Sequence, residues 1–219
     1  MGRIWLSGAL EPLKKTLADP AAGAQLELLN LSRYQIAILE RDYQAAERFL
    51  REVPAETFVT MPFLAHPKPM NEALLAVARG AAPETLENAL VTARREVEQQ
   101  LDTPGASSNL GELGLIDAFL GRKEDAIREG RRFLEEQTYS MLEKNDATAN
   151  LALIYARTGE TDEAIKLIEK LLTVPANLDG LWIFTMTQAD LKWRWVWDPI
   201  RDDPRFQRIL AGPEPKTIY

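Results

Sequence analysis

The sequence predicts an all-α protein built from repeated pairs of helices. Leu (31) and Ala (28) dominate, whereas Val and Ile together number 19, and unbranched side chains lose little freedom in a helix. Apolar residues recur at spacings of three and four within residues 151–158 and again within 164–172. No stretch of five or more residues alternates cleanly between hairpin turns, so no strand is expected.

Length, composition and charge exclude several classes of protein. With 219 residues, 46% of them apolar, the chain can bury a core of its own, and the absence of Cys excludes a disulfide framework. The net charge of −7 argues against a nucleic-acid-binding protein, which needs a surplus of Lys and Arg for phosphates. No apolar run approaches the roughly 18 residues of a membrane span. The N-terminus shows no signal peptide, so we expect a cytoplasmic protein.

Short turn signals divide the predicted helices into pairs. Gly159 follows one helical stripe as a left-handed C-terminal cap, and residues 160–163 then place a capping side chain and acids at the next helix start. The same arrangement recurs at residues 121–126, more weakly at 40–46, and in a degraded form at 79–85.

Alignment of these turns gives a period. Ala46, Thr85, Ala126 and Ala164 occupy the matched positions, each roughly 40 residues after the one before. A period of this length is typical of an α-α superhelix, in which each unit buries a face against its neighbours. A small residue at this position lets the paired helices approach closely.

We therefore expect a single domain, 1–219, with about four helical hairpins after an extra N-terminal helix. The approximate units are 27–65, 66–104, 105–143 and 144–177, followed by a C-terminal aromatic cap over 178–219.

Two stretches resemble the tetratricopeptide repeat (TPR) family. One contains Leu151, Ala152, Tyr155, Gly159, Ala164 and Pro175, and the other contains Leu113, Gly114, Gly121 and Ala126. In the second stretch Asp117 stands where an aromatic residue is usual. The tail, residues 197–206 (WDPIRDDPRF), is similar to an ending on the repeat regions of bacterial signalling proteins, where the repeats follow cyclase, Ser/Thr kinase or winged-helix domains.

The TPR resemblance implies that the first helix of each pair lines a concave groove. The residues presented there are Ser108, Glu112, Leu115, Phe119, Asn150, Leu153 and Arg157. This mixture suits a peptide or a helix laid in a groove. For Leu115 and Leu153, packing between neighbouring repeats is an equally good interpretation. Of the Lys/Asn/Arg clamp by which family members bind chaperone tails, only Asn150 is present.

Four of the five Trp lie between residues 182 and 197. Trp193, Trp195 and Trp197, with Phe206, form either a cap over the last apolar helix face or an aromatic docking surface. The cap is the preferred interpretation, with Trp197 and Phe206 closing that end.

No catalytic, metal or cofactor site is predicted. The single His, His66, lies in a Pro-bracketed connector with no second metal ligand and no nucleophile at a recognisable spacing. Gly111 and Gly114 lack the Lys and the length of a phosphate loop, so close helix packing explains them better.

The sequence thus predicts a protein–protein interaction scaffold rather than an enzyme. Its partner would be a protein or a peptide, and it would regulate an attached or cognate signalling domain. The alternatives are a homo-oligomerisation module or spacer within a larger signalling chain, which allows a homodimer, and, ranked below it, an enzyme whose site leaves no motif.

Overall fold

The computed structural model describes residues 11–18, 26–55, 68–101, 107–137, 141–173 and 186–213. These ranges contain helices and turns but no strand, which confirms the predicted all-α class. His66, Pro175 and Trp182 lie outside the described residues, as does the side chain of Ser108. The described helices are α2 (Glu11–Ala18), α3 (Leu26–Leu39), α4 (Tyr43–Glu52), α6 (Lys68–Ala78), α7 (Pro83–Gln99), α8 (Ser107–Phe119), α9 (Lys123–Glu136), α10 (Met141–Thr158), α11 (Thr161–Leu172), α12 (Gln188–Trp193), the 3₁₀-helix η1 (Trp195–Ile200) and α13 (Pro204–Ala211).

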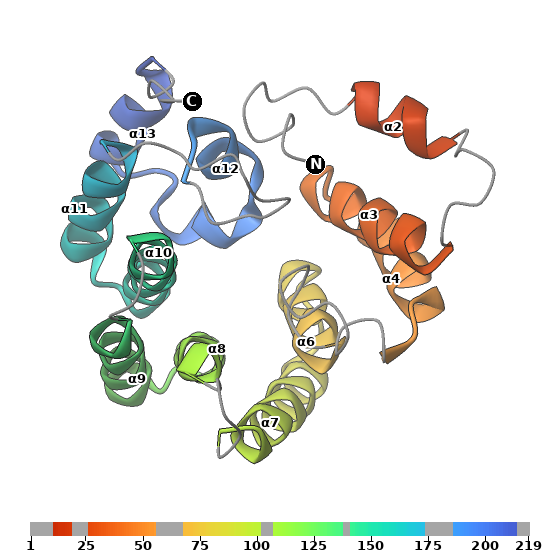
Figure 1. Ribbon diagram of the computed structural model, residues 1–219, viewed down its shortest axis with the longest axis horizontal. Coiled ribbons are helices and arrows are strands. Elements are labelled where there is room, and N and C mark those ends of the chain that lie inside the picture. The colour runs from red at the N-terminus through yellow and green to blue at the C-terminus, as the bar shows by residue number, and fades with distance from the viewer. Residues whose placement is uncertain are drawn as a thin grey trace.

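The helices follow the chain around an arc, and each packs against its neighbours (Figure 1). Helices α6, α8 and α10 lie on the inner side of the arc, and α7, α9 and α11 lie on the outer side (Figure 1). The C-terminal elements α12 and η1 lie inside the arc, and α13 packs against α11 (Figure 1). The expected unit boundary between residues 143 and 144 falls within α10, which begins at Met141.

Four helix-to-helix turns share one conformation. Arg41, Gly80, Gly121 and Gly159 have φ of 59, 64, 75 and 81°, all in the left-handed region. In each turn the next N–H reaches back to a carbonyl five residues earlier, as in the bond from Arg122 to Asp117. Each left-handed residue follows the previous one by roughly 40 residues, so the spacing seen in the sequence is the spacing of the turns.

Of the four positions matched between the turns in the sequence, Thr85 is not equivalent to the other three. Ala46, Ala126 and Ala164 are each fully buried, whereas Thr85 is exposed. Between Gly80 and Pro83 the chain has two residues, where the other turns have one before the helix begins. The N–H of Leu86 therefore bonds the carbonyl of Ala82, as that of Ala46 bonds Asp42, and Leu86 is the counterpart of the buried alanines.

Close helix contact explains Gly114. A Cβ at this position would lie 3.0 Å from the carbonyl oxygen of Ala126 and 3.1 Å from the backbone nitrogen of Gly130. Glycine is therefore what allows α8 and α9 to approach, as the sequence predicted. Within the described ranges, no helix has both the length and the apolar character needed to cross a bilayer.

Candidate functional site

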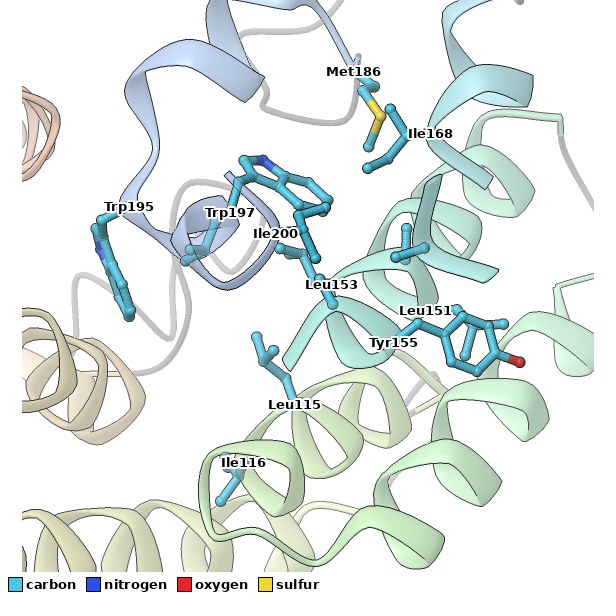
Figure 2. Packing of buried hydrophobic residues seen from close by; sticks show 14 of the residues in the cluster. Leu115, Ile116, Leu151, Leu153, Tyr155, Ile168, Met186, Trp195, Trp197 and Ile200 are labelled. Atoms are coloured by element: carbon cyan, nitrogen blue, oxygen red, sulfur yellow. The ribbon is translucent and has the colours of Figure 1, made fainter. Parts of the chain in front are cut away.

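The inner faces of α8 and α10 meet the tryptophan-rich segment of the same chain. Leu115 and Leu153 are 3% and 7% exposed, and they belong to one hydrophobic cluster with Trp195 and Trp197. Figure 2 shows Leu115 and Leu153 on the side of their helices that faces Trp197 and Ile200. Of the two interpretations open for these leucines, a groove residue and a packing residue, their burial in the cluster that contains Trp195 and Trp197 favours packing and leaves almost no area for a partner.

Two half-buried residues of this face, Arg157 and Phe119, form a stack with the buried Trp195. The guanidinium carbon of Arg157 lies 4.5 Å from the centre of the Phe119 ring, and that ring lies 5.9 Å from the ring of Trp195 at 38°. Burial lowers the pKa of Arg157, and the negative charge of Asp198 opposes this shift. The buried Nε of Arg157 has no hydrogen-bond partner in the described part of the chain. The partly desolvated guanidinium of Arg157 therefore lies over the face of the Phe119 ring, which stabilises its charge.

Two further polar groove candidates, Glu112 and Asn150, also lie against their own chain. Glu112 is half-buried on α8, and Asn150 of α10 donates a hydrogen bond of 3.2 Å from Nδ2 to the carbonyl of Gly111. Asn150 thus links the inner helices α8 and α10 to each other.

Three of the four aromatic candidates are interior residues. Trp195, Trp197 and Phe206 are 7%, 1% and 0% exposed, whereas Trp193 is half-buried. Trp197 donates from Nε1 to the buried carboxylate of Asp190 at 3.0 Å, so its single polar atom is satisfied inside the core. This burial leaves Trp197 and Phe206 little area for docking, which favours the interpretation of the segment as a cap.

The run of charges and prolines after Trp197 builds the turn that positions η1 and α13. Arg201 donates to the backbone carbonyls of Leu191, Lys192 and Arg194 at the end of α12, and its Nε donates to Asp198 at 2.7 Å. Arg201 therefore satisfies carbonyls that the end of a short helix leaves unpaired.

Asp203 then caps α13. Its carboxylate accepts from the backbone N–H of Arg205 at 2.8 Å and from the guanidinium of the same residue. The hydrogen bond from the Arg205 side chain holds the pKa of Asp203 at about 2. Arg205 also pairs with Asp162 of α11 at 2.7 Å, which ties α13 to the last long helix.

A long-range ion pair joins the first turn to η1. Arg41, between α3 and α4, donates to both carboxylate oxygens of Asp198, at 2.9 and 2.8 Å. Burial raises the pKa of Asp198, but the hydrogen bonds from Arg41 and Arg201 outweigh it and lower that pKa below its usual value. Asp198 is thus shared by two guanidiniums from opposite ends of the chain.

A second charged cluster lies where α7, α8 and α9 meet. Asp117 is fully buried and accepts from Arg94 at 2.9 and 3.2 Å and from Arg122 at 3.2 Å. Glu129 lies beside it, and burial together with the charge of Asp117 raises the pKa of Glu129 to about 7. The Asp at an expected aromatic position was the signal of this cluster in the sequence, although its partner Arg94 could not be identified there.

The outer side carries an open cavity that the sequence did not indicate. It has a volume of about 710 Å³ and lies between α9 and the start of α11, with Tyr155 of α10 in its lining. The hydroxyl of Tyr155 accepts from Nε of Arg131 at 3.0 Å. The remaining lining residues are Lys123, Glu124, Ile127, Arg128, Arg132, Glu135, Glu160 and Glu163.

Within the described residues, no group of three or more acidic or His side chains is placed to hold a metal ion. Comparison with protein-family models, with curated proteins and with solved structures found no match to this chain.

Proposed function

We propose that the chain is a helical-repeat scaffold of the TPR type that binds a protein or peptide partner. The observation that carries the proposal is the fourfold recurrence of one left-handed turn at intervals of roughly 40 residues, each between two packed helices. Repeats of this kind stack into a superhelix whose faces serve as extended binding surfaces. About four hairpins, α3–α4, α6–α7, α8–α9 and α10–α11, form the superhelix in this proposal.

The outer cavity is the surface we assign to the partner. Around α8 and α10 the inner face is covered by Trp195 and Trp197, whereas the cavity between α9 and α11 is open. Half-buried Ile127 and charged residues of both signs line this cavity, and Arg131 reaches the hydroxyl of Tyr155, a core residue that is 5% exposed at the edge of the cavity. Arg is enriched in interface centres, and a polar rim is usual around them.

The similarity of residues 197–206 to the tail of bacterial signalling proteins supports a regulatory role in such a protein. In this chain those residues form the Arg201 and Asp203 turns, so the tail motif is a structural ending for the last repeat. Trp195 and Trp197 offer little surface for self-association, because both side chains are buried within one chain.

The test compares charge reversals in and away from the cavity. Arg131→Glu with Arg132→Glu changes two exposed residues of the cavity, and Arg51→Glu with Arg95→Glu makes the same change in net charge on α4 and α7. Proteins retained by the wild-type chain from a lysate of its source are identified, and their binding is then measured with purified components.

We expect the cavity variant to weaken binding by about tenfold or more and the control variant to leave it unchanged. Equal binding by both variants, with circular dichroism showing intact helices, would contradict the assignment of the cavity. A folded wild-type chain that binds no protein at all would contradict the scaffold proposal itself.

A further inference from the structure

Arg41 occupies a backbone conformation that the other repeats give to glycine. Its φ of 59° matches those of Gly80, Gly121 and Gly159 at the equivalent turns. A residue with a Cβ is strained in this region, and such strain persists only where something else in the structure holds it. The side chain of Arg41 therefore has a function that glycine cannot supply.

That function is visible in its partner. Arg41 makes a bidentate pair with Asp198 of η1, 157 residues further along the chain. The contact links the turn of the first helix pair, α3–α4, to the C-terminal segment inside the arc (Figure 1). Two parallel hydrogen bonds fix both the distance and the orientation of the two elements.

Both residues of the ion pair lie in segments that other hydrogen bonds hold in place when the pair is broken. Asp198 keeps its hydrogen bond to Arg201, which also donates to three carbonyls around the end of α12. The turn at Arg41 keeps its own backbone bonds, from Arg41 to Ile38 and from Asp42 to Ala37. Both side chains are also reached by solvent, being 46% and 38% exposed, so dissolved ions can compete for them.

We propose that Arg41 and Asp198 form a reversible latch that closes the arc. When the pair breaks, α3–α4 moves away from η1, and when the pair re-forms, the arc closes on the same geometry. The contacts of α3–α4 with α6, through α4 and through the hydrogen bond from Tyr34 to Asn71, act as the hinge. The latch is a property of the fold and holds whether or not the outer cavity binds a partner.

The chain allows an unusually direct test because it contains no Cys. Gln44 on α4 and Arg208 on α13 are both exposed, and a spin label can be attached at each after substitution by Cys. Pulsed electron paramagnetic resonance then measures the distance between α4 and α13. In low salt the otherwise wild-type chain is expected to give one narrow distance distribution.

Arg41→Gly and Asp198→Asn should each broaden this distribution toward longer distances, and about 1 M NaCl should do the same to the wild type but add nothing to the variants. Because glycine is the residue of the three other turns, Arg41→Gly cannot act by damaging the turn. Asp202→Asn, which changes an exposed carboxylate of the same segment, is the matched control and should behave as wild type. If the narrow distribution persists in Arg41→Gly and in Asp198→Asn at both salt concentrations, the latch proposal is overturned and apolar packing alone closes the arc.

Discussion

Asp117 of α8 is completely buried and lies 2.9 Å from Nε of Arg94, a residue of the preceding helix pair. The pair joins α7 to α8 at a position where the resemblance to TPR repeats leads one to expect an aromatic side chain. A charged contact here replaces part of the apolar packing between two successive units, and its energy depends on both partners being present.

Replacing Asp117 by Asn should therefore destabilise the fold strongly. The change removes the negative charge that faces Arg94 and Arg122, and breaking a buried pair by losing one partner costs about 3 kcal/mol. Urea unfolding at neutral pH measures the loss in free energy. Asp125→Asn, which removes an exposed partner of Arg128, is the control and should cost less than about 1 kcal/mol. Equal effects of the two substitutions would show that Asp117 is not held as described.

The same cluster predicts how stability changes with pH. The pKa of Glu129 in the folded chain is about 7, raised from an ordinary 4.5. Between these values the folded state binds more protons than the unfolded state, so this group makes the fold less stable as pH rises through that window. Carboxylates with lowered pKa values, such as Asp198 and Asp203, act in the opposite direction, but only at lower pH.

Glu129→Gln replaces the carboxyl group by an amide, which stays neutral at every pH of the experiment. We expect the variant to be more stable than wild type at about pH 8, by about 1 kcal/mol, and to lose this advantage at about pH 5. Urea unfolding at several pH values measures both curves. If the free energies of unfolding of the variant and the wild type differ by the same amount at every pH, a raised pKa for Glu129 is ruled out.

Two glycines of the same region should respond differently to alanine. At Gly114 an added Cβ meets backbone atoms of α9, so Gly114→Ala must push the two helices apart and should cost about 2–3 kcal/mol. At Gly121 an added Cβ has open space, and only the φ of 75° opposes it, so Gly121→Ala should cost about 1 kcal/mol. Thermal and urea unfolding compare the two, and the reverse order would contradict the close contact of α8 and α9.

The indole of Trp197 should stabilise the fold through its hydrogen bond as well as through the volume that it fills. Trp197→Phe leaves one oxygen of the buried Asp190 carboxylate without its donor, and we expect a loss of about 1–3 kcal/mol. Trp193→Phe, at a half-buried position of the same segment, is expected to cost less. Unfolding monitored by circular dichroism separates them, and a neutral Trp197→Phe would mean that Asp190 is not a buried partner.

The parts of the fold that the sequence predicted are those encoded over short distances. Gly121 and Gly159 end helices by backbone geometry alone, and Ala126 and Ala164 are small because a neighbouring helix lies against them. The misplaced match at Thr85 shows how sensitive such an alignment is, because one extra alanine before Pro83 shifts the whole helix face.

The candidate site was less predictable because its contacts join distant parts of the chain. Leu115 and Trp195 share a cluster although they lie far apart in the sequence, and nothing in either local pattern indicates that η1 covers α8. The choice between a groove residue and a packing residue, open for Leu115 and Leu153 in the sequence, depends on that contact. The cavity beside Tyr155 is equally a product of how α9, α10 and α11 are stacked.

The tryptophan-rich segment belongs to the core and covers the inner face around α8 and α10, which leaves other surfaces to a partner. Hydrogen exchange of the native chain, read by mass spectrometry or nuclear magnetic resonance, tests it most directly. The amides of Leu191, Arg194 and Trp197 donate within α12 and η1, and we expect them to exchange as slowly as amides in the middle of α8 and α10. Exchange of these three amides at the rate of an unprotected loop, while α8 and α10 stay protected, would contradict the claim and return the inner face to the partner.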